Sequence, residues 1–116
     1  MGRRILCVED EAVVAMLIED VLLDAGFTVI GPFAKQAPAI AAITEGSVDA
    51  AVLDVNIRGE RSYPIADALV ENDIPFLFLT GYGEQGVDQR YRDHRIVQKP
   101  FSRGDFLTTL GRILEP

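Results

Sequence analysis

The sequence predicts an α/β protein with a doubly wound, five-stranded parallel sheet, and two observations lead to this prediction. Five short apolar runs recur along the 116 residues, and segments in which apolar side chains have mostly helical spacing separate them. Continuous apolar runs are typical of parallel strands that helices cover on both faces. Strands that alternate with helices define this fold class, and the length suits one domain over residues 1–116.

The first strand is expected at Arg4–Val8, where an apolar run follows two arginines. A helix over about Glu11–Ala25 comes next, because apolar residues recur there at helical spacing. This predicted stripe consists of Val14, Leu17, Ile18, Val21, Leu22 and Ala25. Gly26 is well placed to end the helix, as glycine is common directly after a helix terminus.

The second strand is expected to be short, Thr28–Ile30, because Gly31-Pro32 follows and should break the chain. The second helix is expected over about Gln36–Glu45. Pro38 is tolerable there only near the first turn, and Gly46 stands at the other end.

The third strand is expected at Ala50–Leu53, followed by a polar loop over Asn56–Ser62. Ser62 is a candidate cap for a third helix over Tyr63–Asn72, since a serine side chain can accept a hydrogen bond from a helix N-terminus. The fourth strand is expected at Phe76–Leu79.

The segment Gly81–Arg95 has the weakest pattern, because it is rich in glycine and poor in large apolar residues. We expect a short fourth helix around Val87–Tyr91 or local mobility. The fifth strand is expected at Arg95–Gln98, and a last helix begins after Ser102. Its apolar stripe consists of Phe106, Leu107, Leu110, Ile113 and Leu114.

Composition limits the classes of function. A net charge of −7 argues against non-specific nucleic-acid binding, which requires a positive face. No apolar run approaches the length of a membrane span, so no membrane insertion is expected. The first strand begins too early to leave room for a signal peptide. Cys7 is the only cysteine, which excludes an internal disulfide and favours a cytoplasmic location.

Reactive side chains follow four of the five predicted strands. Glu9-Asp10 follows the first strand, Asp54 the third, Thr80 the fourth and Lys99-Pro100 the fifth. In open α/β sheets, ligands bind beyond the carboxyl ends of the strands. Several acids with a hydroxyl and an ammonium suit a divalent metal and a phosphoryl group.

These residues carry a resemblance to a known family. The chain resembles the receiver domain of bacterial two-component response regulators over essentially its full length. The matching pieces are Val8-Glu9-Asp10-Glu11, Leu53-Asp54, Thr80-Gly81 and Lys99-Pro100-Phe101. The resemblance implies the flavodoxin-like strand order 2-1-3-4-5. Phe78-Leu79-Thr80-Gly81-Tyr82 is similar to the FAT GUY receivers of alphaproteobacteria, with Leu79 in place of their alanine.

The resemblance implies a role for each matching residue. Asp54 is expected to accept a phosphoryl group from a phosphohistidine of a histidine kinase or a histidine phosphotransfer protein. Asp10, Asp54 and the backbone carbonyl of Asn56 are the expected ligands of Mg²⁺, with Mn²⁺ as an alternative ion. Glu9 is expected to reach the metal through a bound water or directly.

Lys99 and Thr80 are expected to contact the phosphate oxygens after transfer. Gly81 and Pro100, the neighbours of these two residues, are expected to modulate the site, and the Lys99-Pro100 peptide is a candidate for the cis form.

Two further positions concern the lifetime and the readout of phosphorylation. Asn56 and Tyr82 should flank the phosphate, and we hypothesise that Tyr82 slows or directs dephosphorylation. Ile96 occupies the position where many receivers have an aromatic residue that rotates on phosphorylation. The sequence therefore does not indicate how phosphorylation is read out.

Two alternative functions remain open at this stage. One is a small Mg²⁺-dependent phosphatase with an aspartyl nucleophile, although that chemistry needs a second acid at the position of Asn56. The other is a degenerate receiver that binds partners without phosphorylation. The preferred interpretation is a stand-alone receiver that is not an enzyme acting on other substrates. It would be a monomer or weak dimer that signals by contact with an unidentified target protein.

Overall fold

A computed structural model describes residues 2–81, 87–91 and 94–115. Its main sheet has five parallel strands, and the first three in space are β2 (Thr28–Phe33), β1 (Arg4–Val8) and β3 (Ala50–Asp54). They are followed by β6 (Phe76–Thr80) and β7 (Arg95–Gln98). Counted within this sheet the order is 2-1-3-4-5, so the predicted fold class is confirmed.

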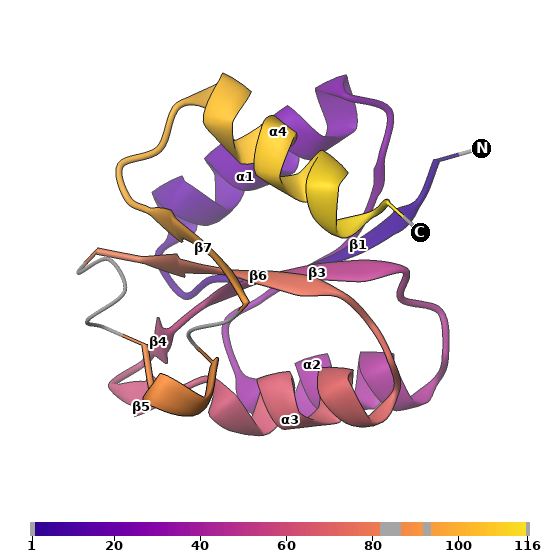
Figure 1. The fold of residues 1–116 in the computed structure, drawn as a ribbon, viewed down its shortest axis with the longest axis vertical. Helices are drawn as coiled ribbons and strands as arrows, with labels where there is room; N and C mark the ends of the chain where they lie inside the picture. The colour runs from indigo at the N-terminus through magenta and orange to yellow at the C-terminus, as the bar shows by residue number, and fades with distance from the viewer. Residues whose placement is uncertain (1, 82–86, 92–93, 116) are drawn as a thin grey trace.

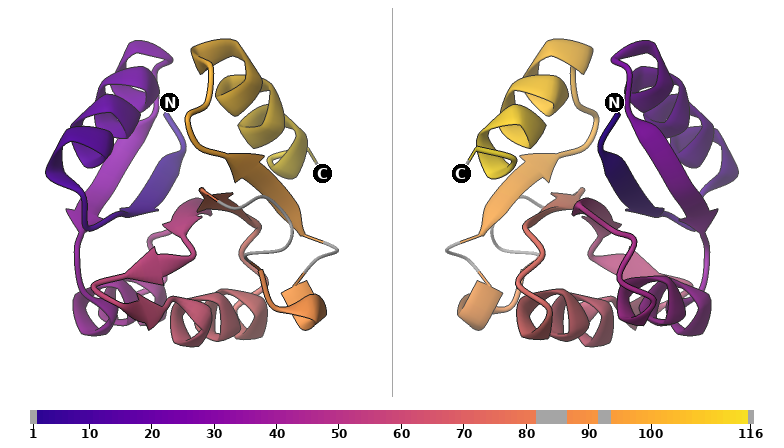
Figure 2. Two further views of the ribbon diagram at one scale, coloured as in Figure 1. Left: turned by 90° about the vertical axis from the view of Figure 1, so that its left-hand side faces the viewer. Right: turned by 90° about the vertical axis from the view of Figure 1, so that its right-hand side faces the viewer.

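Helices cover both faces of the sheet (Figure 1). α1 (Ala12–Asp24) and α4 (Arg103–Ile113) lie on one face, while α2 (Gln36–Thr44) and α3 (Tyr63–Glu71) lie on the other. Figure 2 shows the same three layers from both sides. These bounds agree with the predicted helices to within one residue at most ends. None of the helices in the described part of the chain is long and apolar enough to cross a membrane.

The strands bury side chains on both faces because successive residues point to opposite sides of a sheet. In β1, Ile5 and Cys7 belong to the core under α1 and α4, while Leu6 and Val8 belong to the core under α2 and α3. All four are completely buried. Burial of a large apolar side chain contributes about 1.5–3 kcal/mol to the free energy of unfolding. One core on each face of the sheet therefore holds the strands, and with them the residues at their carboxyl ends, in place.

The second strand is longer than predicted, because Gly31-Pro32 does not end it. β2 continues to Phe33, whose carbonyl accepts a hydrogen bond from the backbone N–H of Glu9 at 3.0 Å. The register with β1 shifts between Leu6 and Val8, so the Gly-Pro pair forms a bulge that keeps the strand paired. Prediction from local sequence missed this because the partner is β1.

The predicted loop over Asn56–Ser62 contains a small hairpin. β4 (Asn56–Ile57) pairs with β5 (Glu60–Arg61) in antiparallel register. The two residues of its turn, Arg58 and Gly59, have φ values of 52° and 81°. Positive φ at both positions is the requirement of the tightest hairpin turns.

The described residues between β6 and β7 contain one short helix. It is a 3₁₀ helix, η2 (Gln89–Tyr91), and it lies where a short helix around Val87–Tyr91 was expected. Its Tyr91 is buried, and the ring stacks on Tyr63 with the centroids 5.2 Å apart. Tyr82 lies outside the described residues, so the structure does not bear on its hypothesised role.

The two predicted serine caps have different outcomes. Ser102 accepts a hydrogen bond from the N–H of Asp105 at 3.1 Å and caps α4. Ser62 does not cap α3, because its backbone (φ −83°, ψ 16°) is not extended. Its carbonyl instead accepts hydrogen bonds from Ile65 and Ala66. Leu17, expected in the buried stripe of α1, is 55% exposed.

Candidate functional site

Four strands of the main sheet deliver the candidate residues to its carboxyl edge. β1 and β3 are neighbours, and Val8 of β1 is paired with Leu53 of β3. The next residues along the two strands therefore lie side by side. Glu9 and Asp54 therefore meet at the point where the strand order reverses. On the other side of β3, β6 ends in Thr80, whose carbonyl accepts a hydrogen bond from the backbone N–H of Lys99 at 2.8 Å.

Lys99 joins the two buried carboxylates of the site. Its Nζ lies 3.0 Å from Asp54 Oδ2 and 3.1 Å from Glu9 Oε1. Asp54 is 6% exposed and Glu9 is 2% exposed, so both carboxylates are largely removed from water. Buried carboxylates require a charged partner, and the ammonium of Lys99 is shared between them.

Burial and charge shift the proton affinities of the site. Burial first, and then the hydrogen bond and charge of Asp54, raise the pKa of Glu9 to about 7, because together they outweigh the lowering effects of the Glu11 N–H and of Lys99. Burial alone would lower the pKa of Lys99, but the hydrogen bonds and negative charges of Asp54 and Glu9 outweigh this effect and raise it. Lys99 thus stays protonated, while Glu9 titrates near neutral pH.

Three carboxylates form a group that fits a divalent cation. Ligand oxygens of Glu9, Asp10 and Asp54 all lie within 4.8 Å of one another. A set of oxygen donors with excess negative charge is what Mg²⁺ prefers, and Mg²⁺ needs few protein ligands because it retains water. Asp10 is the exposed member of the group, so the site is open to solvent on that side.

The hairpin after β3 forms one wall of the site. The backbone N–H of Asn56 donates to Asp54 Oδ1 at 3.1 Å, and that of Arg58 donates to Asp10 Oδ2 at 2.8 Å. Both donors belong to the hairpin, so these two hydrogen bonds fix the orientation of the Asp54 and Asp10 carboxylates relative to it. The predicted role of the Asn56 carbonyl as a metal ligand stays a prediction.

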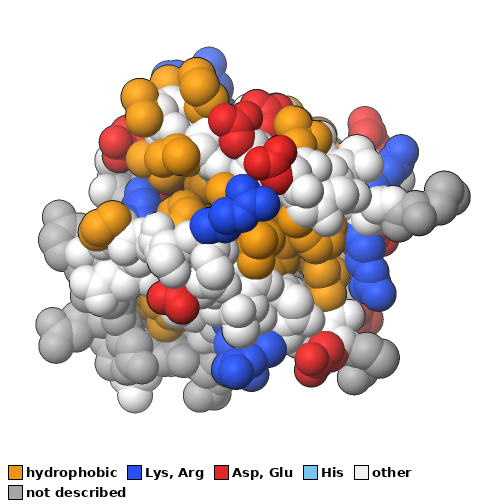
Figure 3. Space-filling view, turned by 90° about the horizontal axis from the view of Figure 1, so that it is seen from above, with side chains coloured by type: hydrophobic (Ala, Val, Ile, Leu, Met, Phe, Trp, Pro, Cys, Tyr) orange, Lys and Arg blue, Asp and Glu red, His pale blue; other side chains and the backbone are white. Residues whose placement is uncertain are grey.

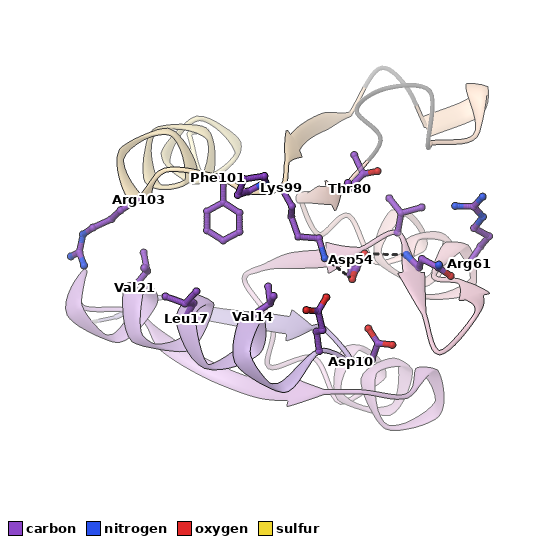
Figure 4. A pocket seen from close by; sticks show the side chains of 15 residues that line it. Asp10, Val14, Leu17, Val21, Asp54, Arg61, Thr80, Lys99, Phe101 and Arg103 are labelled. Carbon is purple, nitrogen blue, oxygen red and sulfur yellow. Dashed lines mark hydrogen bonds and ion pairs between the residues drawn. The ribbon is translucent and has the colours of Figure 1, made fainter.

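A cavity of about 770 Å³ opens above these groups (Figure 4). Besides Asp10, Asp54 and Lys99, its lining includes four residues that sequence analysis selected: Asn56, Thr80, Gly81 and Pro100. The Lys99-Pro100 peptide is cis, as the resemblance implied. The opposite end of the cavity is apolar and is lined by Val14, Leu17, Val21 and Phe101.

Sequence analysis missed two basic residues that line this cavity, Arg61 and Arg103. Neither follows a strand of the main sheet, so the strand-end pattern could not select them. Arg61 reaches the site through the hairpin, and Arg103 reaches it from the first turn of α4. A basic residue shortly after Asp54, in a segment with a Gly turn, is the only signal that pointed to Arg61.

The structure also shows the surroundings of Ile96, the residue at the expected position of an aromatic switch. Ile96 on β7 is half-buried and packs against the core under α2 and α3. Aromatic side chains of that core come from other elements, with Tyr63, Phe78 and Tyr91 in mutual contact. Tyr63 also accepts a hydrogen bond from the N–H of Asp88 at 2.6 Å.

The strand order 2-1-3-4-5, with acids and a lysine at the switch point, defines a flavodoxin-like α/β domain with a ligand site at that edge. Comparison with known proteins agrees with that class. Residues 5–110 match the model of the response regulator receiver domain. The chain therefore belongs to the response regulator receiver family.

Solved structures of similar proteins extend this result. The solution structure of SdrG from Sphingomonas melonis Fr1 is 43% identical and has a TM-score of 0.87, with 98% of each chain covered. A BeF3-activated conformation of SdrG, attributed to Pseudomonas melonis Fr1, is 42% identical with a TM-score of 0.84 and covers 99% of this chain and 100% of that one. The receiver domain of PhyR from Erythrobacter litoralis is 26% identical with a TM-score of 0.86, over 97% and 90% of the two chains.

Curated relatives are longer. Transcriptional regulatory protein TcrA of Mycobacterium tuberculosis is 33% identical over 116 aligned residues, which cover 94% of this chain and 45% of TcrA. PdtaR of the same organism is 25% identical over 93% of this chain and 55% of its own length. The chain thus spans about half the length of the curated relatives that it matches.

Proposed function

We propose that this chain accepts a phosphoryl group on Asp54 from the phosphohistidine of a histidine kinase or histidine phosphotransfer protein. The observation that carries the proposal is the position of Lys99, whose ammonium lies 3.0 Å from Asp54 Oδ2 at the head of an open cavity. A buried carboxylate beside a cation, with access from solvent, is suited to attack phosphorus. Membership of the receiver family supports the same role.

The transfer step conserves atoms and charge. A carboxylate oxygen of Asp54 forms a bond to phosphorus while the bond between phosphorus and the imidazole nitrogen breaks. The electron pair of that bond stays on the imidazole, which takes up a proton from solvent. Lys99 neutralises an oxygen of the transferred group, and Thr80, at the end of the adjacent strand, offers its hydroxyl to another.

Glu9, Asp10 and Asp54 are the residues that would hold Mg²⁺ or Mn²⁺. A bound divalent ion supplies positive charge to the phosphate oxygens and fixes their orientation. Asp10 is held ready for this role by the N–H of Arg58, and Glu9 contributes its charge only when it is deprotonated.

The apolar end of the cavity favours a protein as the phosphoryl donor. Leu17 lines that end, and the adjacent surface of α1 exposes Val13 and Met16, which are 71% and 61% exposed. Figure 3 views this face of the molecule and shows hydrophobic side chains gathered among charged ones. Apolar side chains at helical spacing beside a reactive group suit a helix of a partner protein.

Signalling, rather than turnover of other substrates, is the proposed outcome. The position two residues after Asp54 is Asn56, which cannot protonate a leaving group as the second acid of a phosphatase would. The aspartyl phosphate would therefore persist long enough to change contacts with a target protein.

Mass spectrometry after incubation with Mg²⁺ and acetyl phosphate tests the proposal. The expected result is a gain of one phosphoryl group that is absent in Asp54→Asn and absent after removal of Mg²⁺ with a chelator. Repeated turnover of unrelated phosphomonoesters would instead favour the phosphatase. A protein that neither gains mass nor binds Mg²⁺ would favour a degenerate receiver.

A further inference from the structure

The hairpin places Arg61 next to the phosphoacceptor. Arg61 lies directly opposite Asn56 in the antiparallel register of β4 and β5. Residues opposite each other in such a pair project from the same face, with their Cβ atoms about 4.5–5.5 Å apart. The backbone N–H of Asn56 donates to Asp54 Oδ1, and Arg61 and Asp54 line the same cavity.

Arg61 and Arg103 line opposite ends of the same cavity (Figure 4). Arg103 lies at the apolar end, where its guanidinium forms an ion pair with Asp24 at 3.3 Å. Arg61 lies at the polar end, on the far side of Asp54 from α1. Of the two arginines, Arg61 is the one on the same side of the cavity as Asp54, and its guanidinium, which points away from Asp54 in Figure 4, would have to turn to reach an anion bound there.

The backbone of Arg61 is anchored, while its side chain is exposed on the rim. Its carbonyl accepts a hydrogen bond from Gln36 Nε2 at 3.2 Å, and the same amide group contacts Glu60 Oε2 at 3.2 Å. The first turn of α2 thereby fixes β5. Contacts of a solvent-exposed guanidinium are weak, so those of Arg61 can be exchanged for a charge-assisted bond to a phosphate without a change in the hairpin.

The charge of the site indicates why a second cation would act there. Glu9, Asp10 and Asp54 contribute three negative charges when ionised, and Lys99 contributes one positive charge. A divalent ion would bring the sum to zero. Conversion of the Asp54 carboxylate to an acyl phosphate adds about one further negative charge, which leaves the phosphorylated site one cation short.

We propose that Arg61 is the second cation for the phosphoryl group on Asp54, in addition to Lys99. It binds an equatorial oxygen as transfer proceeds, which accelerates phosphorylation, and it then shields the acyl phosphate and lengthens its lifetime. This inference rests on the proposed function, because it assigns a further residue to the same reaction.

Three variants test the role of Arg61. Arg61→Gln removes the charge, Arg61→Lys keeps it, and Arg95→Gln removes an equal charge from the start of β7, at the other end of that strand from Lys99. Each is incubated with Mg²⁺ and acetyl phosphate, and mass spectrometry follows the rate of phosphorylation and the subsequent loss of phosphate. Thermal unfolding and Mg²⁺ titration of the unphosphorylated proteins accompany these measurements.

Arg61→Gln is expected to phosphorylate about fivefold to twentyfold more slowly and to lose phosphate faster, in line with loss of one charge-assisted hydrogen bond. Arg61→Lys should recover part of the rate, and Arg95→Gln should match the wild type. Mg²⁺ affinity in Arg61→Gln should be unchanged or tighter, because removal of a nearby positive charge cannot weaken cation binding. A merely structural role would weaken Mg²⁺ binding and unfold the variant earlier.

The inference is overturned if Arg61→Gln and wild type phosphorylate and dephosphorylate at equal rates, or if Arg61→Lys is as slow as Arg61→Gln. It is also overturned if Arg61→Gln loses Mg²⁺ affinity together with its rate. A wild-type protein that gains no phosphoryl group overturns the proposed function as a whole. The two failures are therefore distinguishable in one experiment.

Discussion

The ammonium of Lys99 lies 3.0 Å from Asp54 Oδ2, so the unphosphorylated site already contains the cation that the phosphate would need. The same ammonium reaches Glu9 Oε1 at 3.1 Å. Lys99 follows β7, Asp54 ends β3 and Glu9 follows β1, so this ion pair connects three strands at one edge of the sheet. Substitution of Lys99 should therefore change both the free energy of unfolding and the reactivity of Asp54.

Lys99→Ala should destabilise the metal-free protein at pH 8, because it leaves two buried carboxylates without a cation. The expected loss is about 1–3 kcal/mol in the free energy of unfolding, measured by urea denaturation. Saturating Mg²⁺ should restore most of it, since the metal supplies the missing positive charge. Lys35→Ala is the matched control, because Lys35 is the only other lysine and is exposed. Equal losses in the two variants would contradict the prediction.

Glu9 should make the metal-free protein less stable as the pH rises. Its folded-state pKa is raised from 4.5 to about 7, so the folded protein holds this proton more tightly than the unfolded chain does. The resulting stabilisation, of order 1–3 kcal/mol, is complete below about pH 4.5 and is lost as the pH rises to about 7. Urea denaturation of Glu9→Gln, which cannot ionise, should lack this component. A pH profile identical to that of the wild type would exclude the assignment to Glu9.

The same proton should couple to metal binding. Below about pH 7, Mg²⁺ must displace the proton of Glu9, so affinity should rise with pH and then level off. Calorimetry in buffers of different ionisation enthalpy would detect up to one proton released for each Mg²⁺ bound at pH 6, and fewer at pH 8. Proton release that does not change between these pH values would assign Glu9 no part in the site.

Asp10→Asn should separate metal binding from folding. Asp10 is the exposed member of the acidic group, and an amide oxygen there can still accept the N–H of Arg58. We expect Mg²⁺ affinity to fall by about tenfold or more, while the midpoint of thermal unfolding changes little. Asp20→Asn, on the exposed part of α1, is the control for charge alone. The prediction fails if both variants bind Mg²⁺ as the wild type does.

Much of the fold and site was predictable because both depend on short patterns. Strands buried on both faces leave continuous apolar runs, and Asp54 or Lys99 directly after such a run must lie at the carboxyl edge. The neighbour relation of Glu9 and Asp54 needed the strand order as well, which the resemblance to receiver domains supplied and the structure confirms.

The features that were not predictable depend on a partner far away in sequence. β2 continues past Gly31 because Glu9 donates to Phe33. Leu17 is exposed and lines the cavity, whereas Ile18 and Val21 of the same predicted stripe are buried. Arg61 enters the cavity only because β5 folds back on β4. Local pattern carries no information on such contacts.

Gly31→Ala should show how strongly the bulge in β2 supports the site. Gly31 has a φ of 102°, and a Cβ there would lie 2.8 Å from Phe33 N and 2.9 Å from the carbonyl oxygen of Cys7. Because both contacts are with backbone, the variant should lose about 2–4 kcal/mol in the free energy of unfolding.

Gly46→Ala is the matched control for that variant. Gly46 also has a positive φ, 82°, but a Cβ there meets nothing within 4 Å, so only the backbone preference of alanine acts and the loss should be about 1 kcal/mol. Gly31→Ala should in addition weaken Mg²⁺ binding, since displacement of Phe33 removes the acceptor of the Glu9 N–H, whereas Gly46→Ala should not. Urea denaturation and Mg²⁺ titration of both variants measure the two effects. Equal losses of stability in the two variants would show that the close backbone contacts at Gly31 do not limit this position to glycine.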